Sequence, residues 1–202
     1  VVAIVGAGPV GLAALLAVQF FSPAAVIVVD LDDFRLALAE KLGATHTINN
    51  ADGQAVAKIL ELTNGRGVDA AIEAVGHPLT CKLVQEIIGV GGTIANIGVY
   101  SQSAELHKQA LWTKNITIRM GVVNTTTIPL LLKTILGGKL DPGQLITHRL
   151  PFTDVLHAYD LFAHAGQERA VKIVLNVAAQ EPAAKADLVE LIVRRIMQAS
   201  GS

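Results

Sequence analysis

The first fourteen residues, VVAIVGAGPVGLAA (Val1–Ala14), decide the fold that the sequence predicts. Residues 1–5 form a short apolar run rich in β-branched side chains, which is typical of a buried strand. Gly6, Gly8 and Gly11 follow at G-x-G-x-x-G spacing, and from Pro9 onward the pattern is helical. A glycine-rich turn between a strand and a helix indicates a nucleotide-binding βαβ unit.

Each glycine in this turn meets a different requirement of dinucleotide binding. We expect Gly6 to allow the tight turn, Gly8 to let the backbone approach a pyrophosphate, and Gly11 to let the helix pack closely on the strand. Pro9 suits the first helical position, because an N–H at that point has no partner within the helix. The N–H groups of the first turn, including that of Val10, and the helix dipole would then face the phosphates.

An acidic residue follows at the distance that such a site requires. Asp30 ends the next β-branched run, 19 residues after Gly11, where a carboxylate can accept hydrogen bonds from both hydroxyls of the adenine ribose. Leu31 adjoins it, and Asp32 and Asp33 add two carboxylates that would repel a 2′-phosphate. The sequence therefore predicts NAD rather than NADP; the alternative is a glycine turn with a solvated aspartate at a strand end.

Short β-branched runs and helical patterns alternate through the first hundred residues. The runs expected as strands are Val1–Val5, Val26–Asp30, His46–Ile48, Val68–Ala74 and Thr93–Val99. The segments expected as helices are Pro9–Phe21, Asp33–Leu42, Gly53–Thr63 and Pro78–Ile88. Strands joined by helices require a parallel sheet with right-handed crossovers. The predicted fold class is therefore α/β, a Rossmann doubly wound parallel sheet.

The pattern changes after residue 99. The later segments expected as strands are Ala104–Leu106, Asn115–Gly121, Leu145–Leu150 and Ala170–Val177, and those expected as helices are Thr126–Leu136 and Thr153–His164. A stretch rich in Ala and Pro, 178–185, precedes an amphipathic helical pattern at Asp187–Ala199. We expect a dinucleotide-binding domain at 1–138, a further segment at 139–177, and a linker with a tail helix at 178–202.

The composition excludes several classes of protein. Hydrophobic residues make up 51% of the chain and charged residues 16%, which is too apolar for a disordered protein. The formal net charge of −1 supplies no basic excess for binding nucleic acid. Cys81 is the single cysteine, which excludes an internal disulfide and a cysteine-rich zinc site. Glycine and proline interrupt the uncharged run at 1–29, so we expect a cytoplasmic protein rather than a membrane span.

Several segments, in order, resemble the coenzyme-binding half of zinc-dependent medium-chain alcohol dehydrogenases. The similarity covers Val1–Asn176 and rests on VVAIVGAGPVGLAA, VVDLDDFRLALAEKLGATHTIN, VDAAIEAVG, GGTIANIGV and LITHRLPFTDVLHAYDLF followed by AVKIVL. It implies reversible hydride transfer between NAD and a small-molecule substrate that is a primary or secondary alcohol or a polyol. Residues 139–177 match the segment that returns to the catalytic domain, which precedes the glycine turn in those enzymes.

The resemblance also implies a set of coenzyme contacts. Asp30 and Arg35 match the positions that hold the adenosine ribose, and Lys172 matches a basic residue that reaches the pyrophosphate. The segments that match the surroundings of the nicotinamide are Ala74, Val75 and Gly76, then Ile97, Gly98 and Val99, and then Thr117, Ile118 and Arg119. Without the resemblance, these residues equally suit core strands or solvated surface charges.

In the enzymes that the chain resembles, a zinc ion polarises the alcohol, and its ligands lie upstream of the glycine turn. We therefore expect neither a metal site nor a catalytic residue in this chain. The six histidines show no ligand spacing: His157 and His164 would share a helix face about 10 Å apart, too far for one zinc ion. Glu73 ends a predicted strand, and we expect a role that is structural or close to the coenzyme.

Two other functions stay open on the sequence. One is a dinucleotide-binding module without catalysis, and the other is a zinc-free quinone reductase that uses NADPH, against which Asp30 argues. The resemblance implies a homodimer or homotetramer paired near Asn115–Ile118. The tail at 178–202 resembles peptides that attach enzymes to a bacterial microcompartment shell, and a helix that docks on the enzyme itself is the alternative.

Overall fold

The computed structural model describes residues 1–177. It contains two compact units, the first at Val1–Val123 and the second beginning at Asn124, and each is described by itself. The helix expected at 126–136 belongs to the second unit, although the sequence placed it in the dinucleotide-binding domain. The predicted linker and tail helix at 178–202 lie outside the described residues.

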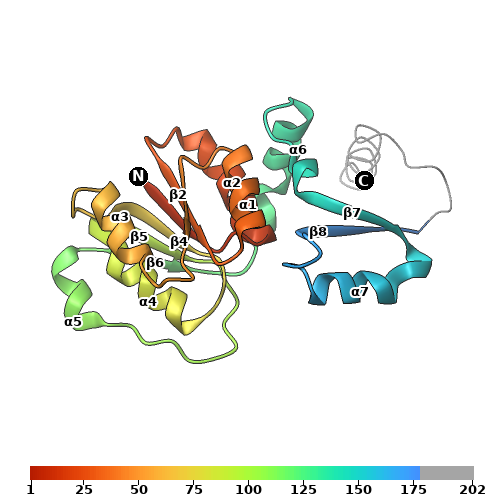
Figure 1. Ribbon diagram of the computed structural model, residues 1–202. Coiled ribbons are helices and arrows are strands. Elements are labelled where there is room, and N and C mark those ends of the chain that lie inside the picture. Colours follow the sequence, from red (N-terminus) through yellow and green to blue (C-terminus); the bar gives the residue numbers. More distant parts are fainter. Residues whose placement is uncertain (178–202) are drawn as a thin grey trace. The chain divides into compact units, whose positions relative to one another are not determined.

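The first unit is built on a six-stranded sheet with the strand order β3-β2-β1-β4-β5-β6. The strands are β1 (Val2–Val5), β2 (Val26–Asp30), β3 (His46–Asn49), β4 (Val68–Glu73), β5 (Ile88–Asn96) and β6 (Thr117–Met120). The helices are α1 (Pro9–Val18), α2 (Asp33–Lys41), α3 (Ala55–Leu62), α4 (Pro78–Ile87) and α5 (Lys108–Leu111) (Figure 1). All neighbouring strands are parallel, which confirms the predicted Rossmann-type sheet.

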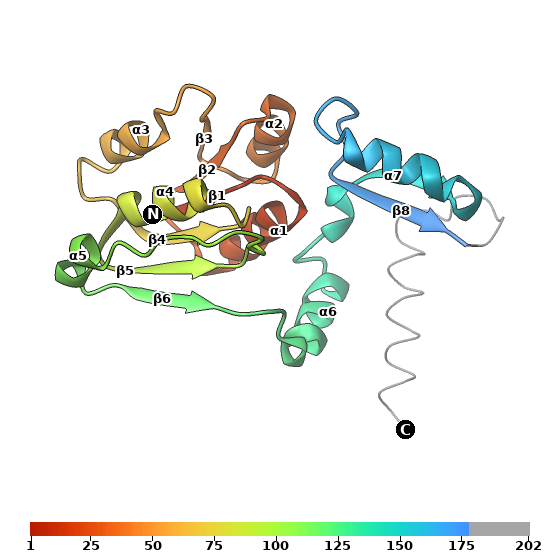
Figure 2. The same ribbon diagram turned by 90° about the horizontal axis from the view of Figure 1, so that it is seen from below.

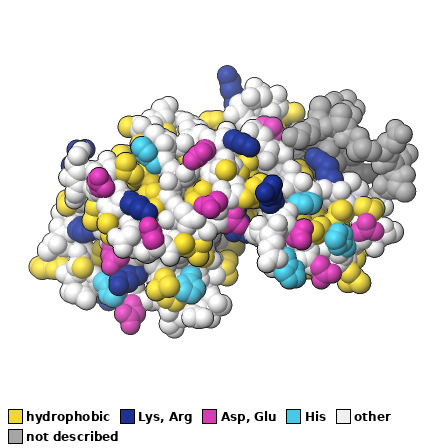
Figure 3. All heavy atoms as spheres, viewed as in Figure 1, with side chains coloured by type: hydrophobic (Ala, Val, Ile, Leu, Met, Phe, Trp, Pro, Cys, Tyr) yellow, Lys and Arg dark blue, Asp and Glu magenta, His cyan; other side chains and the backbone are white. Residues whose placement is uncertain are grey.

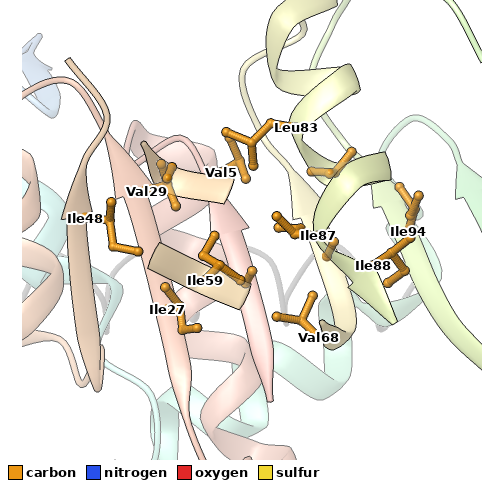
Figure 4. Close-up of a cluster of buried hydrophobic side chains, with 14 of the residues drawn as sticks. Val5, Ile27, Val29, Ile48, Ile59, Val68, Leu83, Ile87, Ile88 and Ile94 are labelled. Atoms are coloured by element: carbon orange, nitrogen blue, oxygen red, sulfur yellow. The ribbon is translucent and has the colours of Figure 1, made fainter. Parts of the chain in front are cut away.

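Helices cover both faces of this sheet, because successive strand residues point to opposite sides. On one face, Val5 of β1 belongs to a buried cluster with Ile59 of α3 and Ile87 of α4 (Figure 4). Ile4 points to the other face and is also fully buried; there α1 and α2 contact β1 and β2. Burial on both faces explains why β1 and β2 are continuous apolar runs in the sequence.

The prediction of a strand at Ala104–Leu106 is wrong. These residues belong to an irregular segment that leads into α5. The buried side chain of Gln85 on α4 donates to the carbonyl of Glu105 (2.9 Å) and accepts from the N–H of His107 (2.8 Å). In a strand, this carbonyl and this N–H would bind a neighbouring strand. Here the side chain of Gln85 binds both groups.

The fifth strand also differs from the prediction in its limits. β5 runs from Ile88, directly after α4, to Asn96, whereas the sequence predicted a strand at 93–99. Gly89 lies inside this strand. A Cβ atom at Gly89 would lie 2.6 Å from the carbonyl oxygen of Arg66, so glycine there allows β5 to pass close to the preceding turn. Residues 97–99 form a loop.

The second unit contains a helix, a strand, a helix and a strand in the predicted order. They are α6 (Ile128–Leu136), β7 (Ile146–Pro151), α7 (Val155–Ala163) and β8 (Lys172–Asn176). β7 pairs in parallel with β8 (Figure 1), and α7 contacts β8 (Figure 2). One face of α7 exposes large hydrophobic side chains at three-residue spacing: Leu156, Tyr159 and Phe162.

The surface carries charges of both signs. In the view of Figure 3, Lys and Arg side chains are interspersed with Asp and Glu over the described part of the chain. Within residues 1–177, no helix is long and apolar enough to cross a membrane.

Candidate functional site

The carboxyl ends of β1, β2 and β4 meet at the point where the order of the strands reverses. β1 lies between β2 and β4, because the chain builds β2 and β3 on one side and then returns to build β4, β5 and β6 on the other. In open parallel sheets, ligands bind outside the strand ends at such a switch point. The glycine turn leaves β1 there, and Asp30 and Glu73 end the two neighbouring strands.

The glycine turn is tightly packed at its first and third glycines. Gly6 has φ +102°, a conformation that favours glycine, and a Cβ atom there would lie 2.6 Å from Cγ2 of Val75. A Cβ atom at Gly11 would overlap the carbonyl oxygen of Gly6. Close contact between α1 and the turn therefore requires glycine at both positions.

Gly8 differs, because its surroundings are open. It is the N-cap residue of α1, and apart from its chain neighbours no atom of the described residues lies within 4 Å of the position that its Cβ would take. No side chain within the described residues caps this helix, and Pro9 fills its first position. The first-turn N–H groups, including that of Val10, and the positive end of the helix dipole can therefore bind an anion. This exposed backbone fits a pyrophosphate.

Asp30 is linked to the glycine turn through its side chain. The N–H of Ala7 donates to its Oδ2 (2.6 Å), and the N–H groups of Leu31 and Asp32 donate to its Oδ1 (2.8 and 3.0 Å). A carboxylate offers about four acceptor positions, so one position at Oδ2 stays available for a ligand hydroxyl. If the Asp30 carboxylate accepted hydrogen bonds from both ribose hydroxyls, one of these hydroxyls would share an acceptor position with a main-chain N–H.

Arg35 supplies an unused donor beside this carboxylate-rich turn. Its N–H binds the Oδ1 of Asp32 (3.1 Å), which caps α2, and its side-chain Nε is buried without a hydrogen-bond partner among residues 1–177. Leu31, which follows Asp30 in the chain, is 68% exposed. The Asp33 carboxylate accepts a hydrogen bond from the side-chain amide of Asn49 (2.6 Å).

The loops after β4 and β5 contact each other. Gly76 has φ +82°, and a Cβ atom there would overlap the carbonyl oxygen of Val99; one at Gly98 would overlap the N–H of Gly76. The side chains of Val75 and Val99 are 50% and 90% exposed. Because Val75 also touches Gly6, the structure brings both predicted loops together with the glycine turn.

Glu73 is fully buried beneath these two loops. Its Oε1 accepts from the N–H groups of Val75 (3.0 Å) and Gly76 (2.9 Å) and lies 2.7 Å from the Thr80 hydroxyl; its Oε2 accepts from the Tyr100 hydroxyl (2.9 Å). Burial and this hydrogen bond raise the pKa of Tyr100, so the hydroxyl stays a donor. The sequence did not predict the hydrogen bond from Tyr100 to Glu73. The two residues lie 27 positions apart, and no sequence motif contains both.

The predicted coenzyme contacts on β6 lie farther from the carboxyl end of their strand than Asp30 and Glu73, which end β2 and β4. Thr117 pairs in register with Thr93 and Arg119 with Ala95, so Thr117 lies three residues before the carboxyl end of the strand. Ile118 packs against the buried core cluster. Met120, which the sequence did not single out, is the β6 residue level with the end of β5.

Lys172 begins β8 and therefore belongs to the second unit. Its side chain is exposed. Its contact with a pyrophosphate stays a prediction.

A pocket of about 330 Å³ lies between α4, β5, β6 and the segment that follows residue 100. Its lining includes Cys81, Gln85, Asn96, Tyr100, Ile118 and Met120. The side-chain oxygen of Asn96 is buried and has no hydrogen-bond partner in the described part of the chain. The pocket adjoins the loop after β5 through Tyr100.

The described residues do not fit a zinc ion. In the part of the chain that the structure describes, no three residues among His, Cys, Asp and Glu are grouped to hold a metal. Cys81 is buried and unpaired by any disulfide. No step of a reaction is therefore assigned to a metal in this chain.

Comparison with known proteins gives one consistent family. A family model described as zinc-binding dehydrogenase matches residues 9–136. An alcohol dehydrogenase of Cupriavidus necator is 34% identical over 179 residues, which are 87% of this chain and 49% of that protein.

Solved structures agree with this result. Zinc-dependent alcohol dehydrogenase 2 of Streptococcus pneumonia, in its apo form, has a TM-score of 0.84 and 47% identity, covering 89% of this chain and 52% of that one. An alcohol dehydrogenase of Escherichia coli CFT073, complexed with the cofactor NADH, has a TM-score of 0.77 and 28% identity, covering 87% and 51%. The chain thus spans about half the length of these relatives. It belongs to the zinc-binding dehydrogenase family, and it corresponds to the coenzyme-binding part of those enzymes.

Proposed function

We propose that this chain is the NAD-binding part of an alcohol dehydrogenase. The observation that carries the proposal is the glycine turn at the switch point, with an open backbone at Gly8, an uncapped α1 and a hydrogen bond from Ala7 to Asp30. The NADH complex of the E. coli relative supports the choice of a nicotinamide dinucleotide.

The order of the strands supports one direction for the coenzyme in this proposal. Neighbouring strands lie about 4.8 Å apart, so an extended dinucleotide crosses several strand ends. Asp30 and Arg35 would hold the adenosine ribose beyond β2, and the first turn of α1 would hold the pyrophosphate beyond β1. The nicotinamide half then lies beyond β4 and β5, where Val75 and Val99 expose apolar side chains that exclude water from it.

The reaction of the whole enzyme in this proposal is reversible hydride transfer between NAD and a primary or secondary alcohol or a polyol. Bound NAD supplies the ring that accepts the hydride, and the residues of this chain bind and orient it. Asp30, Asp32 and Asp33 disfavour the 2′-phosphate of NADP by charge repulsion. A dimer or tetramer and a cytoplasmic location belong to the same proposal.

Substitution of Gly8 by valine tests the proposed site. Gly8 has φ −72° and ψ −177°, which any residue adopts, and its Cβ position is open. Gly8→Val should therefore change the free energy of unfolding by less than about 0.5 kcal/mol. The affinity for NADH should fall at least about tenfold, because the side chain covers the backbone that the pyrophosphate must approach.

Calorimetric titration with NADH measures the change in affinity, and Ala57→Val on the exposed side of α3 is the matched control. A folded Gly8→Val protein that binds NADH as well as the unsubstituted chain would contradict the proposal.

A further inference from the structure

Glu73 is a buried carboxylate that is stabilised by hydrogen bonds alone. It is fully buried at the end of β4, and no Lys, Arg or His within residues 1–177 forms an ion pair with it. A buried charge is costly unless hydrogen bonds compensate it. Its partners are two main-chain N–H groups and the hydroxyls of Thr80 and Tyr100.

These bonds connect the loop after β4 to the loop after β5. The side chain binds Val75 and Gly76 in the first loop and Tyr100 in the second. The main-chain carbonyl of Glu73 accepts from the N–H groups of Ile97 (2.9 Å) and Gly98 (3.0 Å). One residue therefore fixes both loops to the end of β4.

The contact leaves no room for a side chain at Gly98 in the second loop. A Cβ atom at Gly98 would lie 2.6 Å from Oε2 of Glu73, so the backbone passes directly over the carboxylate. The far end of the same segment is held separately, by Gln85 at Glu105 and His107. Position and orientation at residues 97–100 thus depend on Glu73 and Tyr100.

The residues proposed to hold the adenosine ribose share no hydrogen bond with this network among residues 1–177, and the contact of Val75 with Gly6 is a packing contact at the turn proposed for the pyrophosphate. Asp30 and Arg35 belong to β2 and α2, and their hydrogen bonds involve residues 7, 31 and 32. A change at Glu73 can therefore disturb one half of the coenzyme site and spare the other.

We infer that Glu73 is a positioning residue for the nicotinamide half of NAD. Together with Tyr100, it holds the loops 74–76 and 97–100 in the single arrangement that presents Val75 and Val99 to the coenzyme. This inference rests on the proposed function.

Calorimetric titration with NADH and with ADP-ribose, which lacks the nicotinamide ring, tests this role. The unsubstituted chain should bind NADH more tightly than ADP-ribose. Glu73→Gln replaces one acceptor oxygen by a donor, so we expect the NADH affinity to fall about tenfold and the ADP-ribose affinity to change less than about twofold. Tyr100→Phe, which removes one hydroxyl, should lower the NADH affinity about threefold and spare ADP-ribose.

Glu86→Gln makes the same chemical change on the exposed side of α4 and should alter neither affinity. Three results would each overturn the positioning role. In the first, Glu73→Gln lowers the affinities for NADH and ADP-ribose equally, and in the second it lowers neither. In the third, the unsubstituted chain binds the two ligands equally well. A folded chain that binds neither ligand would overturn the proposed function and this inference with it. Circular dichroism verifies folding, and Tyr100→Phe decides the test should Glu73→Gln fail to fold.

Discussion

Asp30 is held in place by main-chain groups before any ligand arrives. Three N–H groups, from residues 7, 31 and 32, bind its carboxylate, so its charge has a fixed position beyond the end of β2. A fixed negative charge repels a 2′-phosphate more strongly than a mobile one, because no side-chain rotation relieves the repulsion. We therefore expect the fixed carboxylate of Asp30 to contribute to the preference for NAD over NADP.

We expect Asp30→Gly to weaken the binding of NADH about tenfold and to narrow the preference for NADH over NADPH. The substitution removes both a hydroxyl acceptor and the repelling charge. Parallel fluorescence titrations with the two coenzymes measure the ratio of their affinities. Asp160→Asn, which removes a charge in the second unit, should leave the ratio unchanged; an unchanged ratio in Asp30→Gly would refute the role of this residue.

At the scale of elements, the contact between the loops after β4 and β5 depends on the absence of side chains. Gly76 has φ +82°, and its Cβ would overlap the carbonyl oxygen of Val99. Gly53 has φ +69° but has no atom within 4 Å of its Cβ position. The two glycines share a backbone conformation and differ in the crowding around it.

Alanine at both positions should separate these effects. Gly53→Ala should lower the free energy of unfolding by about 1–2 kcal/mol through left-handed strain alone. Gly76→Ala should lower it by a clearly larger amount, because the loop after β5 must also move. Denaturant unfolding followed by circular dichroism measures both changes; equal losses would show that the two loops are not in contact.

The elements that the sequence predicts well are those with strong local periodicity. The central strands β1 and β2 were predictable because burial on both faces makes each of them a continuous apolar run. The segment at 104–106 was not, because its backbone is bound by the side chain of Gln85. Periodicity carries no information about a side chain that reaches a distant loop.

The residues of the candidate site also differ in how well the sequence predicts them. The glycine turn and Asp30 have a fixed spacing that reflects one βαβ unit, so the sequence alone identifies them. The network of Glu73 also includes Tyr100, and only the pairing of β4 with β5 brings these two positions together. The register of β6, which places Thr117 three residues before the strand end, likewise requires the assembled sheet.

At the scale of the whole molecule, the second unit presents an apolar surface. Leu156, Tyr159 and Phe162 lie exposed on one face of α7, and exposed apolar groups of this kind mark interaction surfaces. The chain also spans about half the length of its relatives. Both observations agree with the prediction that residues 139–177 pack against a catalytic domain, which stays a prediction.

The central claim is that this chain binds NAD at the glycine turn, and titration of the 202-residue chain with NADH and, separately, with NADPH tests it most directly. Fluorescence should show saturable binding of one NADH per chain and much weaker binding of NADPH. Failure to bind either coenzyme, by a chain that circular dichroism shows to be folded, would contradict the account.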